Sequence, residues 1–196
     1  MLRIVLIRPG STDYDQQHRI QGSLDIPLNE QGNSEVTQLV GQLGDKEIET
    51  VYAPPCEPAQ QTAKAIANGL AVKLKKLERM QNLDHGLWQG MRVADIRQKH
   101  PKVYRKWQEH PENVCPPEGE MLGNAEDRVR ATMIKLLKRH KEGVIGLVVP
   151  EPLASLVRRF VKRGELGNLW KVTNGHGGWE VLNIEADEVS QLVESS

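Results

Sequence analysis

The chain has 196 residues, and 26 lysine and arginine residues balance 26 aspartate and glutamate residues. This length suffices for the core of one domain. Zero formal net charge argues against nucleic-acid and membrane-surface partners, which attract basic proteins. No run approaches the roughly 18 apolar residues of a membrane span, and the first residues do not resemble a signal peptide. The only cysteines, Cys56 and Cys115, make no disulfide framework, so we expect a protein of the reducing cytoplasm.

The first half of the chain alternates strand-like and helix-like patterns. Residues 3–7 form an apolar run that ends at Pro9 and Gly10, as a buried strand would. The elements expected next are a helix over 29–43, a strand over 49–53, an alanine-rich helix over 59–70 and a short edge strand at 74–77.

The second half continues the alternation. We expect a helix over 92–107 that breaks near Pro101, a proline-rich loop over 113–119 and the longest helix over 126–141. Then follow a central strand over 143–149, a helix over 153–162 and a hairpin of 170–173 with 179–184. Because strands alternate with helices, we predict one α/β domain over residues 1–196, with a mostly parallel sheet covered on both faces.

Prolines gather where three of the expected strands end. In open α/β sheets, ligands bind beyond the carboxyl ends of the strands. Six of the 11 prolines follow such ends: Pro9, Pro54, Pro55, Pro58, Pro150 and Pro152. Proline fixes φ and has no N–H, whereas a phosphate-binding loop usually offers glycines and free N–H groups. These corners are therefore short of hydrogen-bond donors.

Five stretches of the sequence resemble, in order, the signatures of a known family. They are Arg8-Pro9-Gly10-Ser11-Thr12, Arg19-Ile20-Gln21-Gly22 with the segment 24–32, Ala59-Gln60-Gln61-Thr62-Ala63, Asp84-His85-Gly86-Leu87-Trp88-Gln89-Gly90, and Pro117-Glu118-Gly119-Glu120. Together they resemble the histidine phosphatase superfamily, also called phosphoglycerate mutase-like. The resemblance runs nearly end to end and implies a three-layer α/β/α sandwich.

The resemblance also implies a chemistry that this chain departs from. Family members transfer phosphoryl groups through a phosphohistidine, with two arginines and a second histidine on the phosphoryl oxygens and a carboxylic acid as proton donor. Here the nucleophile position falls on Pro9, the second arginine on Pro58, the acid near Asn82 and the second histidine on Glu151. Of the five main groups, Arg8 alone is retained.

What is left of the family pocket combines one arginine with carboxylates. The residues that the resemblance assigns to this remnant pocket are Arg8, Gly10, Ser11, Thr12, Asp15, Gln21, Gly22 and Glu151. A carboxylate about 4 Å from a bound anion repels it by roughly 4 kcal/mol at an effective dielectric of 20. We therefore expect Glu151 to pair with Arg8 in the place of a phosphate.

Other reactive side chains have plainer explanations. His85, beside the expected pocket, is either a replacement base or, as we favour, a polar loop residue; His18 is expected to be exposed. His176 resembles the family's second His-Gly-Gly, but a strand pattern follows it, so we interpret it as a turn residue. Neither Cys56 nor Cys115 precedes the arginine-ended, glycine-rich loop that would activate a thiol.

Three functions remain open. We favour a catalytically inactive relative of the phosphatases that binds a small molecule or a protein. The alternatives are an unorthodox phosphatase or mutase that uses the remnant pocket around Arg8, and a structural subunit, with self-association left open. We expect no cofactor, and no metal site, because no histidines and carboxylates cluster at metal-ligand spacing.

Overall fold

A single five-stranded sheet forms the centre of the protein. The computed structural model describes residues 1–163 and 176–194. Within these residues the strand order is β3-β2-β4-β1-β5. The strands are β1 (Leu2–Ile7), β2 (Thr50–Ala53), β3 (Lys73–Lys76), β4 (Gly143–Val148) and β5 (Trp179–Ile184). All neighbours are parallel except β5, which runs antiparallel to β1, so the expected mostly parallel sheet is confirmed.

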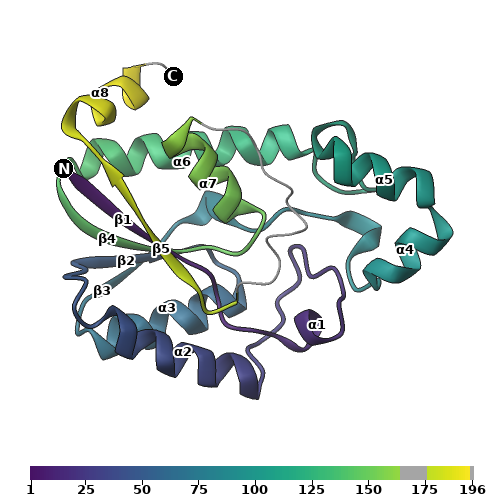
Figure 1. The fold of residues 1–196 in the computed structure, drawn as a ribbon, viewed down its shortest axis with the longest axis horizontal. Helices are drawn as coiled ribbons and strands as arrows, with labels where there is room; N and C mark the ends of the chain where they lie inside the picture. Colours follow the sequence, from purple (N-terminus) through teal and green to yellow (C-terminus); the bar gives the residue numbers. More distant parts are fainter. Residues whose placement is uncertain (164–175, 195–196) are drawn as a thin grey trace.

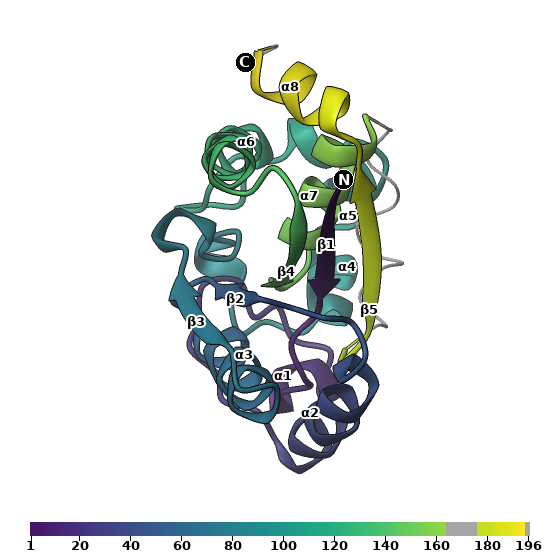
Figure 2. The ribbon, with the colours of Figure 1, turned by 90° about the vertical axis from the view of Figure 1, so that its left-hand side faces the viewer.

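Helices cover both faces of this sheet (Figures 1 and 2). One face packs against α2 (Glu30–Leu43) and α3 (Glu57–Gly69), and the other against α6 (Leu122–Arg139), α7 (Leu153–Lys162) and α8 (Ala186–Glu194). Successive side chains of β1 alternate between the two layers: Leu2, Ile4 and Leu6 enter one core, Val5 and Ile7 the other. A strand buried on both faces reads as a continuous apolar run, and the predicted three-layer sandwich is confirmed.

A smaller apolar cluster lies beyond the carboxyl ends of the strands. It belongs to α4 (Val93–Lys99), α5 (Pro101–Glu109) and nearby loops, which extend to the right in Figure 1. The short helix α1 (Asp13–Gln16) follows β1 on the same side of the sheet. The described residues also form three 3₁₀ turns, over Glu78–Met80, Gly86–Trp88 and Pro111–Asn113. No helix in the described ranges has the length and apolar character to cross a membrane.

Most expected elements occur near their expected positions. The helical stretch over 92–107 breaks at Pro101, as predicted, because proline has no N–H to donate to the preceding turn. The second hairpin strand is β5, whereas residues 170–173 lie outside the described part of the chain. The structure also has two helices that we did not predict, α1 and α8; in α8, Val189 and Leu192 face the core.

Two glycines let the loop after β1 lie directly against α2. A Cβ atom on Gly10 would lie 2.6 Å from the carbonyl oxygen of Gly32, and one on Gly32 would meet the carbonyl oxygen of Ser11. Asn29 caps the helix here, because its side-chain oxygen accepts from the Gly32 N–H at 2.8 Å. The backbone of the β1 loop is thus fixed by close contact with the first turn of α2.

This contact predicts opposite effects for two alanine substitutions in α2. Gly32→Ala should lower the free energy of unfolding by about 1–3 kcal/mol, because the new methyl group meets backbone that cannot move aside. Gly41→Ala, in the same helix with open space around it, should raise that free energy by about 0.5–1 kcal/mol. Urea denaturation measures both. Equal effects at the two positions would contradict the close packing at Gly32.

Candidate functional site

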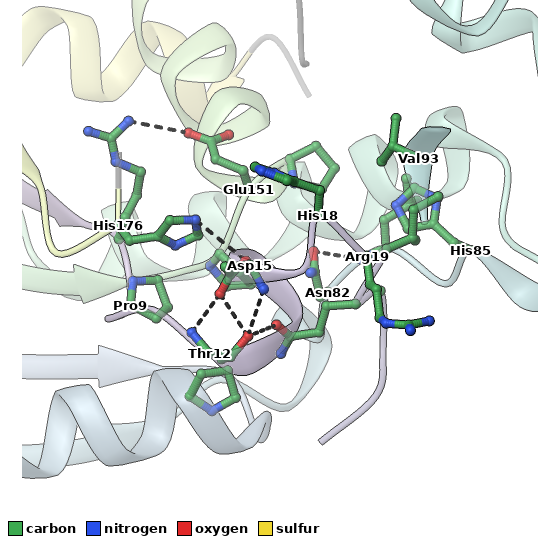
Figure 3. A pocket seen from close by; sticks show the side chains of 18 of the residues that line it. Pro9, Thr12, Asp15, His18, Arg19, Asn82, His85, Val93, Glu151 and His176 are labelled. Carbon is green, nitrogen blue, oxygen red and sulfur yellow. Dashed lines mark hydrogen bonds and ion pairs between the residues drawn. The ribbon is translucent and has the colours of Figure 1, made fainter. Parts of the chain in front are cut away.

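A cavity of about 660 Å³ opens beyond the carboxyl ends of β1 and β4 (Figure 3). All the positions that the family resemblance assigns to the pocket line it: Arg8, Pro9, Gly10, Ser11, Thr12, Asp15, Gln21, Gly22, Pro58, Asn82 and Glu151. His18, His85 and His176 lie on its wall as well. Its size and position are typical of a small-molecule site.

The loop after β1 is held by hydrogen bonds from three elements. The Gly10 N–H donates to the Thr62 hydroxyl of α3 at 3.1 Å. The Ser11 N–H and hydroxyl donate to the Glu35 carboxylate of α2 at 2.8 and 2.9 Å. The Thr12 N–H and hydroxyl donate to Asp15 Oδ2 at 2.7 Å, within the capping box of α1. The polar groups of this loop are therefore engaged within the protein.

The turn before β5 lies against the same loop. The Arg8 N–H donates to the Gly178 carbonyl at 2.9 Å, and the Gly177 N–H donates to the Pro9 carbonyl at 3.0 Å. These bonds bring His176 Nε2 to 3.4 Å from Asp15 Oδ1. His176 is in a turn, as expected, but it also lines the cavity, which the sequence analysis missed.

Glu151 joins the end of β4 to the start of α7. The Ser155 N–H and hydroxyl donate to Glu151 Oε2 at 3.1 and 2.7 Å, so the carboxylate lies at the N-terminus of α7, where the helix dipole favours an anion. Glu151 Oε1 lies 3.9 Å from Arg8 Nη1 and 3.8 Å from Arg158 Nη2. The expected ion pair with Arg8 is present, but at 3.9 Å it is not the bidentate hydrogen bond that Arg–carboxylate pairs often form.

Two further positions mapped from the family supply little chemistry. Pro58 is buried in the first turn of α3 and presents only carbon atoms to the cavity. Asn82 is buried, and its Oδ1 accepts the N–H of Leu83 at 2.9 Å. At these positions the chain has neither a cation nor an acid.

The far end of the cavity is apolar and aromatic. The His85 ring meets the Trp107 ring edge-on, with centroids 5.5 Å apart, and Trp88 packs on Trp107 at 4.9 Å. His85 is buried, with no hydrogen-bond partner for Nδ1. Burial lowers the pKa of His85 to about 4, against the opposing charges of Asp84 and Glu120, so the ring is neutral at pH 7.

His85 was expected on a loop, and it does precede a 3₁₀ turn, but its burial was not predicted. The residues that bury it come from α5, which the sequence did not place against this loop. The available signal was a histidine directly before the Gly86–Trp88 turn, three residues ahead of Trp88.

The remaining reactive candidates lie elsewhere. Cys56 is buried at the start of α3, and burial raises the pKa of its thiol to about 11, so it stays protonated at neutral pH. Cys115 is exposed, and neither cysteine is among the described residues that line the cavity. In the described ranges, no group of three or more histidines, cysteines and carboxylates is placed to hold a metal ion.

The buried, neutral His85 predicts a loss of stability in acid. The unfolded chain binds the imidazole proton near pH 6.5 and the folded chain only near pH 4. Stability should therefore fall as the pH falls through this window, by up to about 3 kcal/mol from this group. In His85→Gln the fall between pH 7 and pH 4 should be smaller by that amount. His18→Gln, at an exposed position, is the matched control for the loss of a histidine.

Denaturant unfolding at several pH values measures these slopes, and NMR titration of the imidazole resonances gives the pKa of His85 directly. A midpoint near pH 6.5 for His85 would contradict its burial.

Comparisons with known proteins agree with this architecture. A model of the histidine phosphatase superfamily (branch 1) matches residues 4–194. Phosphoserine phosphatase 1 from Hydrogenobacter thermophilus is 26% identical over 186 residues, which cover 94% of this chain and 88% of that protein. A mycobacterial glucosyl-3-phosphoglycerate phosphatase solved with VO3 has a TM-score of 0.86 at 23% identity, covering 96% of this chain and 94% of that one.

A phosphoserine phosphatase from Entamoeba histolytica, solved with 3-phosphoglyceric acid, has a TM-score of 0.78 at 21% identity over 92% of this chain and 90% of that one. At these identities the two solved structures bear on the fold alone. The family model covers nearly the whole chain, strands and helices alike, and so this chain belongs to the histidine phosphatase superfamily.

Proposed function

We propose that this chain is a member of the superfamily that binds a ligand in the cavity without transferring a phosphoryl group. The main support is the Glu151 carboxylate, which lies at the start of α7 beside Arg8, at the position that the family resemblance gives to a phosphate-binding histidine. An internal anion there competes with a phosphate for the same cation and the same helix N-terminus. At about 4 Å, two such anions repel by roughly 4 kcal/mol at an effective dielectric of 20.

The nucleophile position supports the same proposal. Pro9 has no side-chain lone pair, so it cannot attack phosphorus. His85 is a weak replacement, because an imidazole with a pKa of about 4 is a poor base at neutral pH. Cys56, with a pKa of about 11, supplies almost no thiolate. The alternative of an unorthodox phosphatase is therefore less well supported.

A small molecule is the ligand class that fits the cavity. A purely structural subunit has no need of an opening of about 660 Å³ lined by charged groups. Relatives named phosphoserine phosphatase and probable phosphoglycerate mutase also suggest a small organic molecule, and not a macromolecule, as the partner. The two unpaired cysteines fit the cytoplasmic location expected from the sequence.

Phosphatase assays test this proposal directly. The purified protein should not hydrolyse p-nitrophenyl phosphate above background, with or without added Mg²⁺, Mn²⁺ or Zn²⁺, because the nucleophile is missing. Release of p-nitrophenol measures the rate, with Arg8→Ala as the control for activity that depends on the cavity. Turnover that Arg8→Ala abolishes would refute the proposal and favour the alternative enzyme.

Restoring the family's groups should restore the covalent step. The triple variant Pro9→His, Pro58→Arg and Glu151→His should take up acid-labile phosphate from a reactive phosphoryl donor, because a nucleophile and two extra phosphate-binding side chains then share the cavity. Phosphorus NMR or radiolabel detects the phosphohistidine. The matched control, Pro58→Arg with Glu151→His, keeps Pro9 and should remain unlabelled. A folded triple variant that takes up no label would show that the family frame is not retained.

A further inference from the structure

The charge pair at the polar end of the cavity has unused hydrogen-bonding groups on both partners. Arg8 Nη1 and Glu151 Oε1 lie 3.9 Å apart, beyond hydrogen-bonding distance. Glu151 Oε1 is buried and has no hydrogen-bond partner, on a side chain that is 10% exposed. The Arg8 guanidinium makes no hydrogen bond to any described residue, and its side chain is 26% exposed. An unpartnered acceptor, buried at the cavity wall and also 3.8 Å from Arg158 Nη2, therefore lies beside an open set of donors.

The neighbouring charges decide which ligand suits this pair. A lone anion is attracted by Arg8 but repelled by Glu151 and by Asp15, which also lines the cavity (Figure 3). A lone cation is attracted by the two carboxylates but repelled by Arg8. A group with an ammonium next to a carboxylate satisfies both sides: its ammonium donates to Glu151 Oε1, and its carboxylate accepts two hydrogen bonds from Arg8.

The rest of the cavity determines the other end of the ligand. Its far wall is built mainly from apolar and aromatic side chains, namely Val93, Tyr104, Trp107, Val114 and Leu122. Two charged residues also line the cavity, but both are engaged within the protein: Arg19 donates to the Gly90 carbonyl at 2.6 Å, and Glu120 accepts from Arg128 at 2.8 Å. His85 on this wall adds a neutral ring, and no charge. An apolar or aromatic group leaves water on binding there, which is favourable in proportion to the area buried.

We propose that the cavity binds a free α-amino acid with an apolar or aromatic side chain, its zwitterionic group between Arg8 and Glu151. This inference rests on the proposed function, because it seats the amino acid where an active relative would hold a phosphate. It also goes beyond that function by naming the ligand's chemical class and the two side chains that recognise it.

Ligands that differ by one charge test the proposal. Isothermal titration calorimetry compares L-phenylalanine with 2-phenylethylamine, which lacks the carboxylate, with 3-phenylpropanoate, which lacks the ammonium, and with inorganic phosphate. L-Phenylalanine, L-tryptophan or L-leucine should bind, and each truncated compound should bind at least about tenfold more weakly, because one charged hydrogen-bonding partner is left without its counterpart.

Variants that neutralise Glu151 or Arg8 should weaken the binding of amino acids and strengthen the binding of one truncated compound each. Glu151→Gln should weaken amino-acid binding about tenfold or more and strengthen the binding of 3-phenylpropanoate, because the repulsion on its carboxylate is gone. Arg8→Gln should likewise weaken amino-acid binding and strengthen that of 2-phenylethylamine. Arg3→Gln is the matched control: Arg3 lies on β1, which Arg8 directly follows, but it pairs with Glu47 outside the cavity, so all affinities should be unchanged.

Different results would contradict the amino-acid inference and the proposed function on which it rests. Hydrolysis of p-nitrophenyl phosphate by the unaltered protein would overturn the proposed function, and phosphate binding tighter than that of every amino acid would overturn the amino-acid inference. Absence of binding by all three amino acids and by phosphate would overturn the amino-acid inference alone. Equal affinity for L-phenylalanine and either truncated compound would also overturn it. Because these comparisons use the unaltered protein, they stand even if a variant fails to fold.

Discussion

The pairing of β1 with its two neighbours fixes the rest of the site. β1 runs parallel to β4 with Ile7 opposite Val148, so the chain leaves both strands at the same edge of the sheet. β5 runs antiparallel to β1 with Trp179 opposite Ile7, so the chain enters β5 at that same edge. Three loops from distant parts of the sequence therefore meet at one point. Arg8, Glu151 and His176 share a cavity because of this register, and a shift of one residue would turn each of these ends to the other face.

Hydrogen bonds within the protein then leave few of the polar groups at this point free for a ligand. Glu35 is engaged by Ser11, and Asp15 by Thr12, while Gly10 donates to Thr62. The loop is thus shaped without help from a bound molecule, which is the preorganisation that ligand sites require. The charges left with open positions are those of the Arg8–Glu151 pair, and the recognition of a ligand must depend mainly on them.

The local sequence pattern was enough to predict the sheet and its layers. Contacts between residues far apart in the sequence could not be predicted in this way. The apolar run over 3–7 and the proline at 101 act within a few residues, so β1 and the break between α4 and α5 followed from the sequence. The family resemblance brought the site residues of the β1 and β4 loops together. It gave no sign that α5 buries His85, or that the turn before β5 places His176 beside Asp15, because both depend on the packing of distant segments. The helix α8 was missed because its short apolar stripe stands among charged residues.

The prolines at this edge explain why a carboxylate and an open arginine remain where an oxyanion would otherwise bind. Pro9, Pro58 and Pro150 all line the cavity, and none has a backbone N–H to donate. An oxyanion needs several converging donors, and at these positions the chain cannot supply them. Hydrogen-bond acceptors outnumber donors here instead, since Glu151 Oε1 accepts no hydrogen bond. A site with surplus acceptors is best filled by a molecule that brings its own N–H groups. The Arg8 guanidinium, which makes no hydrogen bond to any described residue, then suits the carboxylate that such a molecule carries beside them.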